Sequence, residues 1–407
     1  MKIVFLYYYY KEKIKSKNRV EFPPLGMLYV CATLEAIGQD VEVFYFDENT
    51  PSIEFPKADI YAYSISSSVS YPLYISLAPQ LRDNATLHIA GNTHATIFPK
   101  QVMDEMNLDA VFCGAGEETI TRWIKGGCRE RGIIVGGLLE NLDIPFPARH
   151  LIPDKYIYME NRVGGKSKKS ISMISSRGCV FNCKFCAIQN RGKVAFRSLN
   201  DIDREVNFIL RQYPQCDGIT LLDETFTLNA MHAVGVSEIF NKYKLRWECN
   251  SRIDTLNKTI INALSESYCA EIRIGIETGS QKLLNSMKKG FLIEQTYETF
   301  KALKRAGVQV KIYLMHGYPG EDMSTTSETI RFLHKMRKYI DRISLYRFTP
   351  LPGSPIYEET FLNKQEWSEY SIYNDNVRWW GTKKEQEVLN TSYQRLKDVV
   401  DEINNMK

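Results

Sequence analysis

The strongest constraint on the fold is a repeated alternation of short apolar runs with helix-length segments. In residues 1–140 the runs are KIVFLYY, DVEVFYF, DIYAYSIS, TLHIAGN and DAVFCGA, and each ends in small or polar residues. Buried parallel strands have this continuous apolar character, and their carboxyl ends carry ligand-binding loops. The alternation predicts an α/β fold that begins with a Rossmann-like domain over residues 1–140.

A second alternation begins at Ser170, after a Pro- and Gly-punctuated stretch, residues 141–169, that we interpret as a linker. Its six strand runs lie near SISMISS, GITLLD, RWECN, EIRIGIE, VKIYLMH and RISLYRF. Six such units with crossover helices predict a partial (βα)6 barrel over residues 170–350, with its site at the carboxyl ends of the strands. Residues 351–407 are expected to form a short extension, with an aromatic segment and one amphipathic helix.

The composition excludes several classes of protein. A chain of 407 residues is long enough for two or three domains. Its 52 Lys and Arg residues nearly balance 48 Asp and Glu residues, and a net charge of +4 provides no field for nucleic acid or an anionic membrane. No apolar stretch approaches the roughly 18 residues of a membrane span, and no cleavage pattern follows the first residues. We expect a cytoplasmic protein that binds neither nucleic acid nor a membrane.

The nine cysteines fall into two groups. Six lie singly, which is not a disulfide framework: Cys31, Cys113, Cys128, Cys216, Cys249 and Cys269. The other three, Cys179, Cys183 and Cys186, form C-x3-C-x2-C directly after the first barrel strand. Three thiolates on one loop can hold a 4Fe-4S cluster whose fourth iron stays open to an exogenous ligand. Tetrahedral zinc is the alternative, but it needs four protein ligands and no second ligand pair is evident.

This cysteine motif, in its strand-to-loop context, resembles that of radical S-adenosylmethionine (SAM) enzymes, in which SAM chelates the open iron. Segments after the later strands, LLDETFTLN, WECNSRID, IGIETGS and YLMHGYPGE, extend the resemblance. It implies SAM contacts at Phe185, Asp223, Glu224, Asn250, Arg252, Glu277, Ser280, Tyr313 and Gly317. By residue type alone, Arg252 suits a carboxylate and Glu277 suits ribose hydroxyls. Ser280 has the alternative role of capping the next helix.

The N-terminal segments PPLGMLYVCATLEAIG, YSISSSVSYP, AGNTHATIFP and CGAGEETI resemble those of cobalamin-binding domains fused ahead of radical SAM barrels. The implied cobalamin contacts are Pro24, Leu25, Gly26, Ser64, Ser66, Ser67, Gly91, Asn92, His94, Gly114, Gly116 and Glu117. Small residues at strand ends leave room for a nucleotide-like tail, although a Rossmann-like domain without a ligand would share many of these glycines.

The lower face of the cobalt is expected to lack a protein nitrogen ligand. The D-x-H-x-x-G motif of cobalamin mutases is absent, and the loop SISSSVSYP contains no histidine. We expect His94 to hydrogen-bond the cofactor or to play a structural part, since it is the one histidine in a suitable loop.

The resemblance implies a cobalamin-dependent radical SAM C-methyltransferase that methylates an unactivated carbon through a 5'-deoxyadenosyl radical and methylcobalamin. Its cofactors would be the 4Fe-4S cluster, SAM and cobalamin, with flavodoxin or ferredoxin as reductant. One alternative uses the same cofactors for rearrangement, cyclisation or oxidation of a small metabolite; another is a zinc-bearing nucleotide-binding module.

The substrate is less constrained by the sequence than the cofactors are. About 55 residues follow the last barrel strand, too few for a sizeable lid. An open barrel mouth favours an amino-acid side chain of a peptide or protein as substrate. We expect a monomer, and the sequence identifies no catalytic residue beyond the cofactor contacts.

Overall fold

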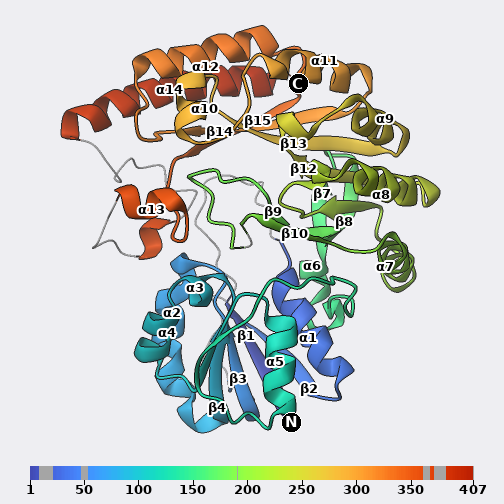
Figure 1. The fold of residues 1–407 in the computed structure, drawn as a ribbon, viewed down its shortest axis with the longest axis vertical. Helices are drawn as coiled ribbons and strands as arrows, with labels where there is room; N and C mark the ends of the chain where they lie inside the picture. Colours follow the sequence, from blue (N-terminus) through green and yellow to red (C-terminus); the bar gives the residue numbers. More distant parts are fainter. Residues whose placement is uncertain (9–21, 47–53, 190, 361–366, 371–381, 407) are drawn as a thin grey trace. The chain divides into compact units, whose positions relative to one another are not determined.

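A computed structural model describes residues 1–8, 22–46, 54–189, 191–360, 367–370 and 382–406 (Figure 1). The chain divides into two compact units. Unit one comprises Met1–Ile157 with Lys364–Tyr370, and unit two comprises Tyr158–Asn363 with Ser371–Lys407. Each unit is built on its own sheet.

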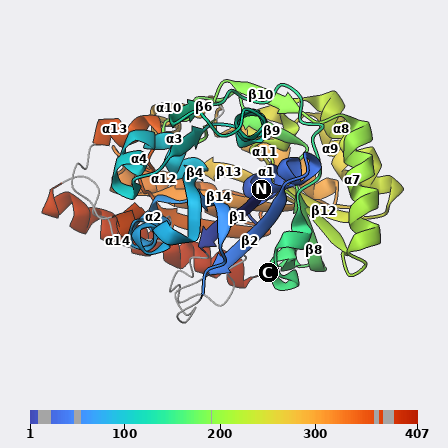
Figure 2. The same cartoon turned by 90° about the horizontal axis from the view of Figure 1, so that it is seen from below.

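Unit one contains a six-stranded parallel sheet in the order β2-β1-β3-β4-β5-β6, covered by helices on both faces (Figures 1 and 2). The strands are β1 (Lys2–Tyr8), β2 (Asp40–Phe46), β3 (Ala58–Ser64), β4 (Ala85–Gly91), β5 (Ala110–Cys113) and β6 (Gly132–Val135). The helices are α1 (Leu25–Ala36), α2 (Tyr71–Leu77), α3 (Thr93–Ile97), α4 (Pro99–Met106), α5 (Gly116–Lys125) and α6 (Asp154–Ile157). The strand order reverses between β1 and β3, and open α/β sheets bind ligands at such a switch point.

A buried tyrosine ties together the strand ends at this switch point. The Tyr74 hydroxyl accepts a hydrogen bond from the backbone N–H of Tyr8, at 2.8 Å, and donates to the carbonyl oxygen of Ser64, at 3.0 Å. Burial raises the pKa of Tyr74, so the hydroxyl stays neutral. Because Tyr8 ends β1 and Ser64 ends β3, one α2 side chain fixes the separation of the two strand ends.

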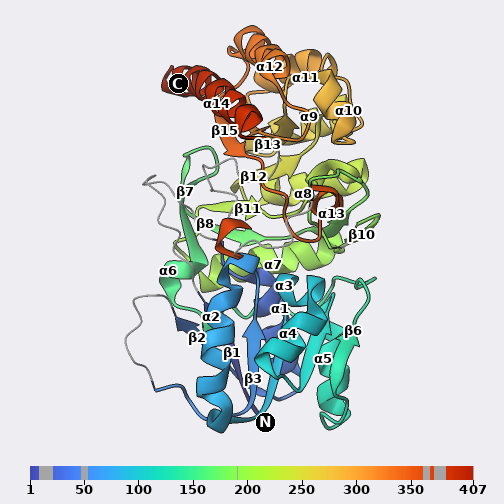
Figure 3. The same cartoon turned by 90° about the vertical axis from the view of Figure 1, so that its left-hand side faces the viewer.

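Unit two contains a curled sheet in the order β15-β14-β13-β12-β11-β8-β7, which we call the barrel sheet (Figure 3). Its strands are β7 (Tyr158–Arg162), β8 (Ser167–Met173), β11 (Gly218–Leu221), β12 (Arg246–Ser251), β13 (Cys269–Glu277), β14 (Gln309–His316) and β15 (Arg342–Arg347). Six of these strands are parallel, and β7 pairs antiparallel with β8 at one edge.

Helices cover one face of the barrel sheet (Figure 1). They are α7 (Leu199–Gln212), α8 (Ala230–Lys242), α9 (Lys258–Glu266), α10 (Gln281–Ser286), α11 (Gln295–Arg305), α12 (Met323–Met336) and α14 (Lys383–Asn405). A separate antiparallel pair, β9 (Ser176–Cys179) with β10 (Lys193–Phe196), and the short helix α13 (Pro355–Thr360) complete the described elements of this unit. The core lies between the barrel sheet and these helices, where strand residues such as Trp247, Ile272 and Ile312 are fully buried.

The predicted α/β class is confirmed, with a Rossmann-like sheet, a partial barrel of six parallel strands and a C-terminal helix. The boundary differs from our expectation, since the expected linker includes β7 and the start of β8. An antiparallel strand there covers the edge of β8, which periodicity alone does not reveal. In the aromatic segment, Trp367 and Tyr370 belong to unit one, and residues 371–381 lie outside the described residues. No helix in the described part of the chain is both long and apolar enough to cross a membrane.

Candidate active site

Of the three motif cysteines, Cys179 ends β9, and Cys183 and Cys186 lie on the loop between β9 and β10. Because these strands pair antiparallel, with Cys179 opposite Lys193, the loop leaves and returns at one point of the unit. The backbone N–H of Cys186 donates to the carbonyl of Cys183 at 3.2 Å, which closes a tight turn between them. Burial raises the pKa of the Cys186 thiol, and the nearby Cys183 and Cys179 thiols act in the same direction. The three thiols are therefore within electrostatic reach of one another.

The thiols suit iron and sulfide as soft donors. Among the described residues, no three His, Cys, Asp or Glu side chains are already closed around a metal position. These three thiols thus do not form a complete metal-coordination site by themselves. As a donor set they fit an iron-sulfur cluster, which contains its own sulfide ions.

Two carboxylates after β11 hold the strand that leads into the cysteine loop. Asp223 is fully buried and accepts hydrogen bonds from the Ser175 backbone N–H and hydroxyl, at 2.7 and 2.6 Å, and from the Ser176 hydroxyl, at 2.6 Å. Glu224 accepts from the backbone N–H of Gly178 at 3.0 Å. These bonds tie β11 to β9 immediately before Cys179, so the carboxylates position the loop.

Arg252 reaches the cysteine loop from the end of β12. Its Nη1 donates to Cys183 Sγ at 3.3 Å, and its guanidinium carbon lies 3.5 Å from the ring centroid of Phe181. Asp254 accepts from Nε and Nη2 at 2.9 and 2.8 Å, a bidentate pair that fixes the guanidinium plane. A buried, oriented cation is thus held beside one of the three motif cysteines.

Glu277, at the end of β13, has a strained backbone. Its φ is +67°, and the pairing of β13 with β14 shifts register between Gly275 and Glu277. Such a conformation is costly for a residue with a Cβ and occurs most often at functional sites. The carboxylate folds back over Gly275, where an added Cβ would lie 2.4 Å from Glu277 Oε1.

Lys289 links these groups to each other. Its Nζ lies 3.1 Å from Glu277 Oε1 and 5.6 Å from the ring centroid of Phe185, and its carbonyl oxygen accepts a hydrogen bond from Arg252 Nη2. The side chain is 4% exposed, so its charge is compensated mainly by Glu277. Lys289 was missed by our sequence analysis, and the only available signal was its place in the Lys-Lys-Gly turn after α10.

Ser280 is fully buried ahead of α10, but it does not cap that helix by its side chain. Within the described residues its hydroxyl has no hydrogen-bond partner. Buried hydroxyls nearly always find one. The unpaired hydroxyl at a strand end therefore fits a ligand that brings a polar group, as SAM would.

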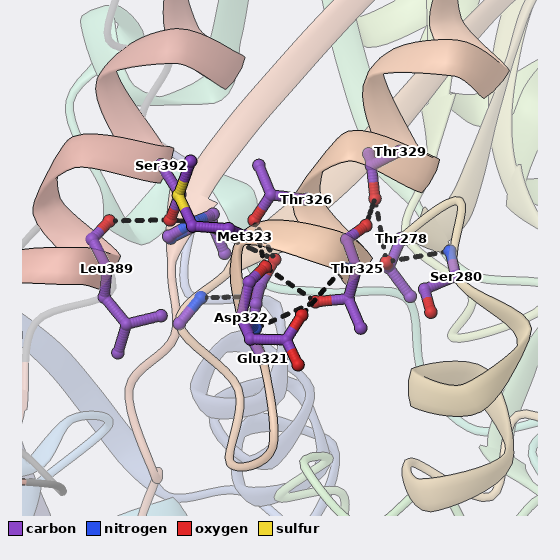
Figure 4. A network of polar contacts seen from close by, with 12 residues as sticks. Thr278, Ser280, Glu321, Asp322, Met323, Thr325, Thr326, Thr329, Leu389 and Ser392 are labelled. Atoms are coloured by element: carbon purple, nitrogen blue, oxygen red, sulfur yellow. Dashed lines mark hydrogen bonds and ion pairs between the residues drawn. The ribbon is translucent and has the colours of Figure 1, made fainter. Parts of the chain in front are cut away.

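The two expected SAM residues near the end of β14, Tyr313 and Gly317, lie in different environments. Tyr313 lies on the face of the barrel sheet opposite the helices, with its ring centroid 6.2 Å from that of Tyr346. Gly317 has a φ of +96° and donates its backbone N–H to Glu321 at 2.6 Å. Thr326 donates to the other oxygen of Glu321 at 3.3 Å, which joins the turn to α12 (Figure 4). Burial raises the pKa of Glu321 to about 7.

In unit one, the expected cobalamin residues gather on the loops after β3 and β4. Asn92, with a φ of +79°, donates to the hydroxyl of Ser64 at 3.1 Å, and the carbonyl of Gly91 accepts from the backbone N–H of Ile65, after β3, at 3.1 Å. Ser66 is exposed and Ser67 half-buried. The remaining expected residues stand at the start of α1 (Pro24, Leu25, Gly26) or around the start of α5 (Gly114, Gly116, Glu117). An added Cβ on Gly26 would meet nothing within 4 Å, so this switch-point position is open.

His94 is buried beneath aromatic rings and does not face open space. Its Nδ1 lies 2.9 Å from the Ser68 hydroxyl, and its ring centroid lies 4.2 Å from that of Tyr71 and 5.0 Å from that of Trp367. Burial lowers the pKa of His94 to about 4, so the imidazole is neutral near pH 7. In the part of the chain that is described, its Nε2 has no partner.

Comparison with known proteins finds a match within the second unit. Residues 173–333 match the family model of the radical SAM superfamily, so this part of the chain is similar to radical SAM domains. The chain is 28% identical over 385 residues to an uncharacterized methyltransferase, PH0819, of Pyrococcus horikoshii, covering 86% of this chain and 82% of the relative. It is 24% identical to a cytidylyl-2-hydroxyethylphosphonate methyltransferase of Streptomyces wedmorensis, covering 83% and 77%.

Two solved structures share the fold beyond the radical SAM domain. The radical SAM methyltransferase TsrM from Kitasatospora setae, solved with tryptophan substrate and a SAM analogue, matches with a TM-score of 0.67 at 14% identity, over 88% of this chain and 75% of that one. The cobalamin-dependent radical SAM enzyme OxsB matches with a TM-score of 0.66 at 15% identity, over 98% and 56%. The predicted resemblance to cobalamin-dependent radical SAM enzymes, and the prediction of an enzyme, are confirmed.

Within residues 173–333, the expected SAM residues fall into three groups. Arg252, Glu277 and Phe185 converge through Lys289, beside Cys183. Ser280 has an unpaired hydroxyl, whereas Asn250 donates to the carbonyl of Asp223 at 3.1 Å and so shares the positioning role of Asp223 and Glu224. Tyr313 and Gly317 belong to neighbouring networks on β14.

Proposed function

We propose that this protein is a cobalamin-dependent radical SAM methyltransferase. The cluster would be held by Cys179, Cys183 and Cys186, SAM by the residues that converge on Lys289, and cobalamin at the β1–β3 switch point. The observation that carries the proposal is the contact of Arg252 with Cys183, at 3.3 Å, in a radical SAM domain that follows a cobalamin-type fold.

The chain's own residues suit the binding of SAM. When bound, the cluster and SAM supply hydrogen abstraction from carbon, and cobalamin supplies the methyl group. Arg252 would hold the SAM carboxylate, since Asp254 fixes its guanidinium plane. Glu277 would accept from the ribose hydroxyls, and the ion pair with Lys289 would hold its carboxylate in place. Phe181 and Phe185 would exclude water from the cysteine loop.

Methyl transfer is favoured over rearrangement or oxidation by the relatives, several of which carry methyltransferase or methylase names. The zinc-module alternative is disfavoured by the radical SAM match over the cysteine loop. Transfer to an unactivated carbon, a peptide or protein substrate, and a flavodoxin or ferredoxin reductant stay predictions. The tryptophan in the TsrM structure and the nucleotide-linked phosphonate in a relative's name point instead toward small substrates.

Anaerobic reconstitution with iron, sulfide and hydroxocobalamin tests the proposal. We expect one 4Fe-4S cluster and about one cobalamin per chain, with 5'-deoxyadenosine formed from SAM under reducing conditions. A chain that retains no cobalamin would contradict the methyltransferase assignment, and a colourless protein containing zinc would contradict the cluster.

Electron paramagnetic resonance of the cob(II)alamin form tests the lower face of the corrin. Because His94 is neutral but enclosed by Tyr71 and Trp367, we expect no superhyperfine splitting from a protein nitrogen. Such splitting, lost in a His94→Ala variant, would refute this part of the proposal.

A further inference from the structure

The two faces of the barrel sheet differ sharply in chemistry. On the helix-covered face, strand residues such as Ile274, Ile312 and Leu314 are fully buried. On the opposite face, which we call the inner face, Lys311 and Tyr313 are only half-buried. The interior of a closed (βα) barrel is normally filled by layers of branched apolar side chains. The inner face therefore lacks the composition of a packed core.

Three cations stand side by side on this inner face. In the register of the sheet, Arg273 of β13 is directly opposite Lys311 of β14, and Lys311 is directly opposite Arg342 of β15. Like charges in directly opposite cross-strand positions are destabilising. An arrangement of this kind needs compensation from nearby carboxylates or from a ligand.

The carboxylates on the inner face are already engaged. Glu248 is fully buried and lies 2.9 Å from Arg162 Nε and 3.5 Å from Arg273 Nη1, and it also accepts from the Thr220 hydroxyl at 3.0 Å. Although burial opposes ionisation, Arg273 and Arg162 hold the pKa of Glu248 below its usual value. Glu248 is thus a charged group shared between two arginines.

The second carboxylate, Glu271, is bound by Arg342, whose Nε lies 2.8 Å from Oε2. Lys311 makes no ion pair among the described residues, and Arg273 Nε has no hydrogen-bond partner there, although Arg273 is only 2% exposed. Burial lowers the pKa of Lys311 to about 8; the charge of Glu271 opposes this shift, whereas Arg342, Arg162 and Arg273 add to it. Among the described residues, Arg273, Lys311 and Arg342 therefore share Glu248 and Glu271, and Glu248 is also paired with Arg162.

We propose that Arg273 and Lys311 bind an anionic group of the substrate, a carboxylate or a phosphate-type group. The inference rests on the proposed function, because it takes the inner face as the place where the substrate lies. A purely structural ion cluster would be balanced in charge and satisfied in its donors. Here, among the described residues, the buried Nε of Arg273 has no hydrogen-bond partner and Lys311 has no ion pair.

The position of the anion site limits the size of the substrate. Arg273 and Glu277 lie on the same face of β13, four residues apart, which corresponds to about 13 Å along a strand. The substrate would extend over this distance, from its target carbon near the strand ends to its anionic group at Arg273. Tyr313 and Tyr346 line the inner face between these positions, so the middle of the substrate would contact aromatic rings.

The test uses the full-length, anaerobically reconstituted protein and calorimetric titration with sulfate, whose charge is constant between pH 6.5 and 9.5. We expect sulfate to bind at pH 7 and to bind about tenfold or more weakly in Lys311→Met, because a charged hydrogen bond is lost. Lys301→Met is the matched control, since Lys301 lies half-buried on α11, away from the barrel strands, in an i,i+3 pair with Glu298. Equal sulfate affinity in the two variants, or no sulfate binding by the wild type, would overturn the proposal.

A pH profile separates ligand binding from a structural role. Wild-type affinity for sulfate should fall as the pH rises from 7 to 9.5, because Lys311 loses its proton near pH 8. Lys311→Arg keeps its charge over this range and should bind sulfate with little change in affinity. A structural lysine would alter the melting temperature without this profile, and an identical pH profile for wild type and Lys311→Arg would contradict the role of Lys311.

Titrations with inorganic phosphate and with succinate identify the class of anion. Tighter binding of phosphate would indicate a phosphate-type group, and tighter binding of succinate would indicate a carboxylate. Formation of 5'-deoxyadenosine from SAM without substrate is measured in parallel. If the wild type binds sulfate but forms no 5'-deoxyadenosine, the proposed function is rejected and the anion site is retained.

Discussion

Adding one methyl group at Gly275 should displace the carboxylate of Glu277. An alanine Cβ at this position would lie 2.4 Å from Glu277 Oε1 and 3.3 Å from Lys289 Nζ, and the first distance is far inside van der Waals contact. The backbone of Glu277 cannot easily yield, because its φ is +67° and the β-bulge with β14 fixes it. The Glu277 side chain must therefore swing away from its present position.

The size of the effect follows from the bond that is lost. A hydrogen bond to a charged group contributes about 1.5 to 3 kcal/mol, so losing the one from Glu277 to the SAM ribose should weaken SAM binding about 10- to 150-fold. Iron content should be unchanged, since no cysteine ligand is touched. Equilibrium dialysis of SAM against the reconstituted Gly275→Ala protein measures the affinity. Gly137→Ala is the control, because a Cβ there meets nothing within 4 Å.

A double-mutant cycle makes this reasoning refutable. Glu277→Ala should weaken SAM binding by a similar factor, and Gly275→Ala combined with Glu277→Ala should add no further loss, because both changes remove the same interaction. Wild-type SAM affinity in Gly275→Ala would refute the assignment of Glu277. Additive losses would mean that the alanine acts through some other part of the site.

Three further perturbations test other parts of the site. Cys183→Ala should abolish the cluster and 5'-deoxyadenosine formation, whereas Cys216→Ala should leave iron content unchanged; equal iron in both variants would reject the ligand assignment. Arg252→Ala should weaken SAM binding about tenfold or more at constant iron, and unaltered dialysis results would reject its contact with SAM. Burial raises the folded-state pKa of Glu321 to about 7, so this group lowers stability progressively as the pH rises from its unfolded value toward 7. The melting temperature of Glu321→Gln minus that of wild type should therefore be larger at pH 7.5 than at pH 5. The same difference at both pH values would contradict this.

The cysteine loop and the strands could be predicted because each depends on a short stretch of sequence. Cys179, Cys183 and Cys186 lie within eight residues, so one turn brings their thiols together whatever surrounds the loop. The alternation of apolar runs with helices predicted both sheets, because burial on both faces of a parallel strand leaves a signal in every strand. The placement of the expected SAM residues at strand ends also followed, since parallel strands end at one edge of a sheet.

Contacts between distant segments were decided only by the tertiary structure. Lys289 joins Arg252 and Glu277 because α10 and the turn after it fold back over the strand ends. Arg252 and Lys289 are 37 residues apart in the sequence. Trp367 packs on His94 across an even longer separation. Such contacts depend on how the elements pack, and the sequence around Lys289 or Trp367 contains no local pattern that predicts its partner.

The sequence by itself determined the strands, the cysteine loop and the identity of the groups at the strand ends. The alternation of Lys311 and Tyr313 with Ile312 and Leu314 is also visible in it. Only the tertiary structure decided which face is covered by helices, and that Lys311 stands opposite Arg273. The physical reason is that side-chain alternation is a local property of one strand, whereas cross-strand register depends on the packing of the whole sheet.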